Sequence, residues 1–294
     1  MGIGTVVVDH QVVVRKLPEP DAKAEILSDR FQVGGPVPTA LALLTRFGAT
    51  TSFIGKWATD RWGEMIEDDL GHARVDLGQA VVSPAVRTGF AHVWVEANTG
   101  RRSIAAYRGS HPIEPADLDG GTWPSFQALH LDAWPSDTAI EAARQMKAAG
   151  GRVFVDFGSP KPNWKSLIAL ADLVNCPLRL LETLFPGDSM ETSAKRLVDL
   201  GADAVTVTNG EAGAWFFQGA TAIHQPAYPV DAVDTNGAGD VFTGSMVFAT
   251  LKNWSAEQRL RFASAAAALK CQRIGNRDAL PTLSQIEAFL SENC

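Results

Sequence analysis

The chain has 294 residues, of which 46% are hydrophobic, and acidic residues exceed basic residues by 33 to 26, which gives a net charge of -7. A chain of this length can bury the core of one large domain or of two smaller ones. The acidic balance, without a dense Lys/Arg run, excludes a general attraction to nucleic acid or to an anionic membrane surface. We therefore expect neither nucleic acid nor membrane as a partner.

The cysteines and the N-terminus indicate where the protein works. Cys176, Cys271 and Cys294 are too few and too scattered for a disulfide framework or a zinc site. The apolar run 6–8 is followed at once by Asp9, with no basic segment before it, which is unlike a signal peptide. No apolar run approaches the ~20 residues that span a bilayer. These features predict a soluble, cytoplasmic protein.

The first hundred residues predict a small antiparallel sheet beside the main body. Extended segments at 12–14 and 25–33 lie between the first strand and the first helix, which runs to about residue 46. Residues 88–96 and 101–107 alternate in polarity around a turn at 98–100, which is typical of a hairpin. We therefore predict a lid over a site, a dimer contact or both, made by segments 10–33 and 87–108.

From about residue 125 the chain alternates strands and helices. The expected strands are short apolar runs at 128–131, 152–156, 171–175 and 204–208. This order predicts an α/β fold with a mostly parallel central sheet covered by helices on both faces. Ligands bind such sheets beyond the carboxyl ends of the strands. The polar residues that we place at such ends are Asp9, Asp132, Asp156, Asn175 and Thr208-Asn209-Gly210.

The most informative segment is Asp234-Thr235-Asn236-Gly237-Ala238-Gly239-Asp240, which leads directly into an apolar helix. Gly237, Ala238 and Gly239 have little or no side chain, so their N–H groups can turn toward an anion at the helix start. Asp240 then lies where a general base would stand if a hydroxyl attacked phosphorus. The alternative is an Asp that caps a buried helix after a flexible turn. Asp234 itself is expected to fix its own loop through backbone N–H groups.

A second glycine pair, Gly34-Gly35, opens the first helix. It either lets a ligand approach the backbone closely or makes a tight strand-to-helix turn. The spaced third glycine of a dinucleotide fingerprint is missing, and so is the Gly-Lys-Ser/Thr end of a P-loop. A nicotinamide-dependent dehydrogenase and a Walker-type nucleotide fold are therefore disfavoured.

In combination and order, these motifs resemble the ribokinase-like (PfkB) carbohydrate kinases over essentially the whole chain. The 234–240 loop is the specific element, and weaker support comes from Asp9, Gly34-Gly35, residues 53–56 and the Thr208-Asn209-Gly210 turn. The resemblance implies a single ribokinase-like domain over 1–294 with a β-sheet lid. Lid strands in this family often pair between subunits, which implies a homodimer.

The resemblance also implies the activity, which is transfer of the γ-phosphoryl group of ATP to a hydroxyl of a free sugar of the ketohexose, ribose or sugar-acid class. Asp240 matches the catalytic base, and Gly237 to Gly239 match the anion hole for the transferred group. The sugar-binding positions implied are Asp9, Gly34, Gly35 and Thr39, and we add Asp132 because of its place at a strand end. The ATP-binding positions implied are Asn175, Thr208, Gly210, Gly237 and Gly239. Mg²⁺ is implied as a cofactor, and a monovalent-cation requirement is left open.

Two departures from the family pattern concern substrate and metal. Thr39 stands where the family commonly has an Asn that contacts sugar hydroxyls. Leu178 stands where a Glu usually helps to order magnesium, and Glu182 lies one helical turn further on. The metal ligands therefore stay unknown. Asp132 is as well suited to capping a helix as to holding a sugar hydroxyl.

Three alternatives remain open. In the first, the acceptor is a sugar phosphate, although we find no obvious basic cluster near Asp9 or Gly34 for a second phosphate. In the second, the acceptor is a nucleoside. The third is a non-catalytic sugar or nucleotide sensor on the same fold, which the Leu178 departure motivates.

Overall fold

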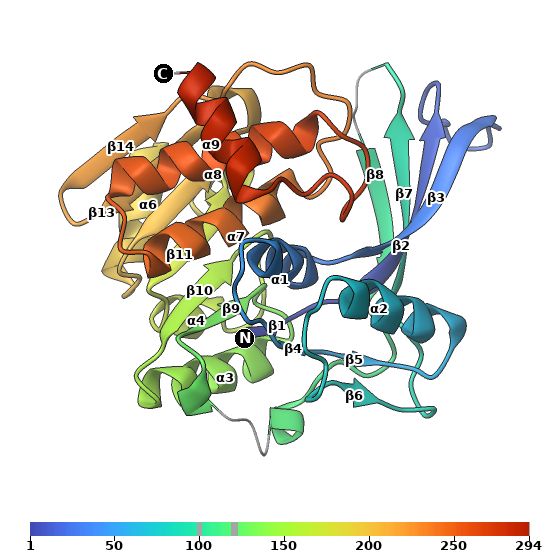
Figure 1. Ribbon diagram of the computed structural model, residues 1–294, viewed down its shortest axis with the longest axis horizontal. Helices are drawn as coiled ribbons and strands as arrows, with labels where there is room; N and C mark the ends of the chain where they lie inside the picture. The colour runs from blue at the N-terminus through green and yellow to red at the C-terminus, as the bar shows by residue number, and fades with distance from the viewer. Residues whose placement is uncertain (99–101, 119–122, 294) are drawn as a thin grey trace.

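The computed structural model, which describes residues 1–98, 102–118 and 123–293, contains a large central sheet flanked by helices and a smaller sheet at one side (Figure 1). The central sheet has the strand order β14-β13-β12-β11-β10-β9-β1-β4. Its strands are β1 (Gly2–Ile3), β4 (Phe53–Ile54), β9 (Ala128–Leu131), β10 (Arg152–Asp156), β11 (Leu173–Pro177), β12 (Val205–Thr208), β13 (Ala214–Gln218) and β14 (Thr221–Gln225). All pairs from β12 to β4 are parallel, and β13 and β14 are antiparallel. The predicted mostly parallel central sheet is confirmed.

Helices cover both faces of this sheet. The helices are α1 (Pro36–Arg46), α2 (Arg61–His72), α3 (Ser136–Ala148), α4 (Trp164–Ile168), α5 (Leu178–Leu184), α6 (Met190–Asp199), α7 (Ala238–Leu251), α8 (Ala256–Cys271) and α9 (Leu283–Glu292). Short 3₁₀ turns are η1 (Pro115–Leu118), η2 (Trp123–Ser125) and η3 (Gly210–Ala212). Side chains alternate across β10, so Val153 and Val155 pack toward α3 to α6, whereas Phe154 packs toward α1, α7 and α8.

The smaller sheet has the order β3-β2-β7-β8, made by β3 (Ile26–Gly34), β2 (Val7–Val14), β7 (Phe90–Glu96) and β8 (Arg102–Tyr107). The prediction of a small separate sheet is confirmed, but it begins at Val7, and it is not purely antiparallel because β2 pairs with β7 in parallel. The long crossover through α1 and α2 permits that parallel pair, whereas the short β2–β3 and β7–β8 connections require antiparallel pairs. Residues 99–101 of the predicted hairpin lie outside the described residues. Two further short strands, β5 (Lys56–Trp57) and β6 (Val81–Val82), pair with each other.

The position predicted for Asp9 is wrong. The first central strand, β1, already ends at Ile3, because the next ladder donor, the Thr5 N–H, donates to Oδ2 of Asp132 at 2.8 Å. The chain then crosses to the smaller sheet β3-β2-β7-β8, which is the predicted lid. Asp9 therefore lies in β2, where it pairs with Gln32 of β3. Asp132, Asp156 and Thr208-Asn209-Gly210 do lie at or directly beyond the carboxyl ends of β9, β10 and β12, whereas Asn175 lies in the middle of β11.

None of the helices in the described part of the chain is long and apolar enough to cross a membrane.

Candidate active site

The loop before α7 forms an open helix start. Gly237 has a φ of 77° and is the N-cap of α7, and Asp240 lies in the first turn. The Ala238 N–H donates to the Thr235 carbonyl at 3.3 Å, whereas no described residue beyond the chain neighbours and the helix's own backbone comes within 4 Å of a β-carbon placed on Gly239. The first N–H groups of a helix have no intrahelical acceptor. The space over Gly239 is therefore open to an anion approaching the helix start, next to the Asp240 carboxylate.

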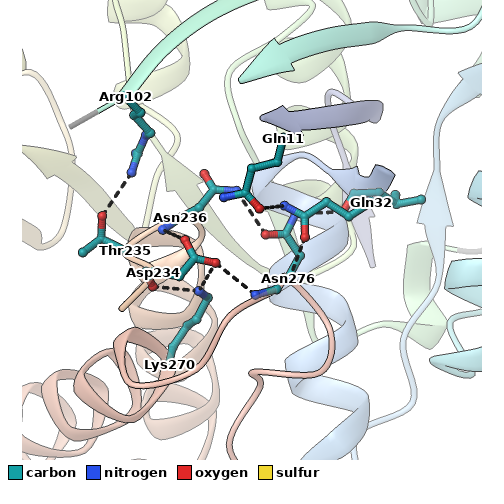
Figure 2. Close-up of polar contacts among 10 residues, drawn as sticks. Gln11, Gln32, Arg102, Asp234, Thr235, Asn236, Lys270 and Asn276 are labelled. Atoms are coloured by element: carbon teal, nitrogen blue, oxygen red, sulfur yellow. Dashed lines mark hydrogen bonds and ion pairs between the residues drawn. The ribbon is translucent and has the colours of Figure 1, made fainter. Parts of the chain in front are cut away.

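Asp234 fixes the shape of this loop, as its sequence position predicts. Its Oδ1 accepts a hydrogen bond from the Asn236 N–H at 2.9 Å, and its Oδ2 accepts one from the Gly275 N–H at 3.0 Å (Figure 2). The Asn236 carboxamide in turn donates to Oδ1 of Asn276 at 3.1 Å. The loop is thus tied to the segment that follows α8.

Asp9, in lid strand β2, and Asp240, in the first turn of helix α7, interact electrostatically although they come from different parts of the fold. Burial and, after it, the charge of Asp240 raise the pKa of Asp9 to about 7, against the opposing effect of Arg277 and Arg102. Burial likewise raises the pKa of Asp240 to about 6, and Arg102 and Arg277 oppose this shift. The lid therefore presents a carboxylate to the loop that carries the candidate base, and two arginines partly neutralise the pair.

The Gly34-Gly35 pair is required by close contacts. A β-carbon on Gly34 would lie 2.2 Å from Oδ2 of Asp9. Gly35 has a φ of 116°, and its β-carbon would lie 2.2 Å from the Thr5 carbonyl oxygen. Any side chain at Gly34 would displace the Asp9 carboxylate. The interpretation of this pair as a tight turn is confirmed, and the close approach of a ligand to its backbone stays a prediction.

At the carboxyl end of β10 and the middle of β11 a buried hydroxyl links three groups. The Thr243 hydroxyl of α7 accepts a hydrogen bond from the Asn175 carboxamide at 2.7 Å, and lies 3.0 Å from both Oδ2 of Asp156 and the Gly239 carbonyl. The Asn175 Oδ1 accepts a hydrogen bond from Thr206 at 2.8 Å. The amide of Asn175 is thus occupied by protein partners, and through Thr243 it positions the first turn of α7. Burial and the nearby Asp240 charge raise the pKa of Asp156 well above its usual value.

Two residues predicted to bind substrate already have protein partners. The Thr39 hydroxyl accepts a hydrogen bond from Nη1 of Arg277 at 3.0 Å, and the residue is 1% exposed. The two carboxylate oxygens of Asp132 accept from the N–H groups of Thr5 and Trp134 at 2.8 and 3.0 Å. Asp132 does not cap α3, whose N-cap is Pro135. It holds the end of β1 against the end of β9.

The predicted nucleotide side of the site lies along β11 and β12. Thr208 is in register with Pro177, and Gly210, with a φ of 50°, has no heavy atom within 4 Å of the position that a β-carbon would take. Leu178, which begins α5, packs against the hydrophobic core, while Glu182 on the same helix is exposed. Among the described residues no group of three or more His, Cys, Asp or Glu side chains could hold a metal ion.

Sequence reasoning missed two arginines of the site. Arg102 of β8 reaches across from the lid, and its Nη1 lies 3.4 Å from the Thr235 hydroxyl (Figure 2). Arg277 pairs with Asp69 of α2 at 2.8 Å through Nε, and its Nη2 is buried with no hydrogen-bond partner among the described residues. No local pattern marks either residue, because each reaches the site only through tertiary packing.

A family model described as pfkB family carbohydrate kinase matches residues 1–283. The chain belongs to this family. It is 30% identical to an ATP-dependent ribose-1-phosphate kinase of Halopiger xanaduensis over 97% of this chain and 95% of the relative. It is 26% identical to a ribokinase of Staphylococcus aureus over 97% of each.

The fold also matches solved structures. An Arabidopsis thaliana ribokinase complexed with ribose and ATP superposes with a TM-score of 0.84 at 25% identity, covering 98% of this chain and 97% of that one. The ribokinase-like fold and the activity class, a carbohydrate kinase, are both confirmed.

Proposed function

We propose that this carbohydrate kinase transfers the γ-phosphoryl group of ATP to a hydroxyl of a free sugar of the ribose, ketohexose or sugar-acid class. The observation that carries the proposal is the position of Asp240, in the first turn of α7 beside an open helix start, with a pKa raised to about 6. A base poised near neutral pH can take a proton from a hydroxyl. The named activities of the relatives, ribokinase and ribose-1-phosphate kinase, support the same chemistry.

Each group has a role in this reaction. Asp9 accepts hydrogen bonds from sugar hydroxyls, Gly34 and Gly35 let the sugar lie against the backbone, and Asp240 removes the proton of the attacking hydroxyl. The N–H groups at Gly237 to Gly239 receive the charge of the transferred phosphoryl group. The lid excludes water from the transfer, which prevents hydrolysis of ATP.

The nucleotide in this proposal lies along Asn175, Thr208 and Gly210, and it brings Mg²⁺ with it. Magnesium prefers oxygen ligands and is commonly bound by one or two carboxylates together with substrate phosphates. Asp156 fits this role. Its carboxylate is buried, and burial and the charge of Asp240 raise its pKa, so its negative charge is unfavourable there. A divalent cation would relieve that unfavourable charge. The ion would neutralise charge on the phosphates. Because Leu178 stands where the family usually has a Glu, that carboxylate would not help to order the ion here.

A specific observation favours a second candidate, a sugar phosphate as acceptor. Within the described part of the chain, Nη2 of Arg277 is buried without a hydrogen-bond partner, while its other two nitrogens hold Thr39 and Asp69. A guanidinium N–H without a partner suits an anionic oxygen of the substrate. Arg102 adds a second positive charge near Asp9 and Asp240. These arginines supply positive charge that is not apparent from the sequence around Asp9 and Gly34.

The experiment for the proposed function measures ADP release from Mg·ATP with free ketoses, aldoses, sugar acids, sugar phosphates and nucleosides. A free sugar as the best acceptor, with a KM that Arg277→Met raises less than ~10-fold, supports the first candidate. If a sugar phosphate is best and Arg277→Met raises its KM at least ~10-fold, the second candidate replaces the first, since a lost charged hydrogen bond of ~1.5–3 kcal/mol has this effect. Preference for a nucleoside would contradict both.

We also propose a homodimer formed through the lid. Every residue of β8 is exposed, and large apolar side chains of the lid remain accessible, including Ile104 at 54% and Ile26 at 53%. An exposed apolar sheet edge is a surface that a second copy can cover. Light scattering should give a dimer that Ile104→Glu weakens, with Val82→Glu, exposed on β6, as control. A monomer at all concentrations would contradict this.

A further inference from the structure

Lys270 of α8 is a cation buried without contact to water. Its side chain is 0% exposed, and it is one of the largest fully buried side chains among the described residues. Burying an ammonium group without oxygen partners is strongly unfavourable. The function proposed above gives this charge no role, so its partners decide what it does.

The ammonium group is held by a single residue of the candidate anion-hole loop. Nζ of Lys270 donates to the carbonyl oxygen of Asp234 at 3.0 Å and lies 3.4 Å from Oδ2 of the same residue (Figure 2). The N–H groups of Val233 and Asp234 donate to the carbonyl oxygen of Cys271, the residue after the lysine. A carbonyl and a carboxylate oxygen thus converge on one positive charge where α8 meets the loop.

This charge lies next to the candidate catalytic groups. A β-carbon on Gly237 would lie 3.8 Å from Cε of Lys270 and 3.8 Å from Oδ2 of Asp240. The lysine stem and the carboxylate of the base therefore both lie about one contact distance from the N-cap of α7. The positive charge of Lys270 also lowers the pKa of Asp240.

We propose that Lys270 is a positioning residue that serves as a built-in monovalent cation, holding the loop 234–237 in the shape that receives the phosphoryl group. Carbonyl and carboxylate oxygens are the ligands that bind K⁺ as well as ammonium groups. Because the lysine ammonium already occupies the oxygens of Asp234, phosphoryl transfer by this chain requires no added K⁺. The inference rests on the proposed function and answers the question of cation dependence that the sequence leaves open.

The kinetic test compares cations in a tetramethylammonium buffer of constant ionic strength. Wild type should keep the same kcat, within about twofold, with and without K⁺. Lys270→Ala removes the charge and leaves space for an ion, so its kcat should fall at least ~10-fold, about 1.4 kcal/mol, and recover several-fold with K⁺ or NH₄⁺. The KM for the sugar should change little. Lys270→Met fills the same space and should not be rescued, and Lys147→Met, at a part-exposed ion pair with Asp172, is the control.

A second readout needs no activity. An ion that binds only the folded chain raises Tm, so K⁺ should raise the Tm of ligand-free Lys270→Ala above its value in tetramethylammonium, and leave wild type and Lys270→Met unchanged. If Lys270→Ala does not fold, Lys270→Ser takes its place.

Three results would overturn the inference: several-fold activation of wild type by K⁺, near-normal kcat of Lys270→Ala without added cations, or a loss of activity and Tm that no cation restores. If wild type phosphorylates no acceptor, the proposed function fails, and the Tm comparison still decides whether a cation replaces the lysine.

Discussion

Gly34 and Asp9 are in such close contact that a β-carbon on residue 34 would lie 2.2 Å from Oδ2 of Asp9. The two residues come from adjacent lid strands, β3 and β2. The position of the Asp9 carboxylate therefore depends on the residue type at position 34. The carboxylate keeps its place in the site only because residue 34 has no side chain.

Gly34→Ala should therefore displace the Asp9 carboxylate and weaken sugar binding. We expect the KM for the sugar to rise at least ~10-fold, the loss of about one charged hydrogen bond, while the KM for ATP changes little. Gly71→Ala is the matched control, because it has no heavy atom within 4 Å and no left-handed backbone. An unchanged sugar KM in Gly34→Ala would remove Asp9 from the sugar site.

The acid limb of kcat/KM should lie near pH 6–7. The pKa values of Asp240 and Asp9 are raised to about 6 and about 7, and both carboxylates must be ionised to accept hydrogen bonds or a proton. Activity should thus fall as pH drops through this range. Arg102 lowers both pKa values, so Arg102→Met should move the limb to higher pH. A profile that stays flat down to pH 5 would be inconsistent with these shifts.

Asp240→Asn should stabilise the protein at pH 8. Because burial raises the pKa of Asp240 from 3.8 to about 6, the folded chain binds more protons than the unfolded chain between these values. The free energy of unfolding therefore falls as pH rises through this range, and the loss is complete above it. Asn carries no charge, so its Tm should exceed that of wild type at pH 8 and the difference should shrink by pH 4. Asp231→Asn, exposed in a loop, should show no such pH dependence.

Thr243→Val should disturb the first turn of α7. The substitution leaves the buried Asn175 carboxamide and the Asp156 carboxylate without their shared partner. We expect ~1–3 kcal/mol lower free energy of unfolding in urea titrations and a reduced kcat. Thr183→Val is the control, because this exposed hydroxyl bonds only its own helix. Equal losses in the two variants would show that the buried link has no special role.

The sequence predicts the parallel strands of the central sheet and lid strands β3, β7 and β8 well, and it misses the antiparallel edge of the central sheet and the start of the lid. Strands β9 and β10 have the bounds predicted for them, because short apolar runs between polar residues mark buried parallel strands. Hairpin β13–β14 is not predicted, since its outer strand is mostly exposed and lacks that pattern. The sequence places Asp9 on the wrong sheet because the Val6–Val8 run looks continuous with β1, and only the Thr5–Asp132 contact ends the central strand.

The site residues also fall into two groups, those that a local pattern predicts and those that only tertiary packing brings to the site. Asp240 and the glycines of its loop are found by local pattern, whereas Arg102 and Arg277 reach the site from distant segments and leave no local signal. Lys270 does carry a signal: it follows Ala263 and Ala266 at spacings of seven and four, which places it on the buried face of α8.

The most direct test of the account is the rate of phosphoryl transfer from Mg·ATP to the best acceptor, measured for wild type and Asp240→Asn with ATP binding measured in parallel. We expect Asp240→Asn to keep ATP binding while kcat falls at least ~100-fold, since a positioned base contributes ~10²–10⁴-fold. Near-normal turnover in Asp240→Asn would remove Asp240 from the role of base. ATP binding by wild type without transfer to any acceptor would instead indicate a sensor on this fold.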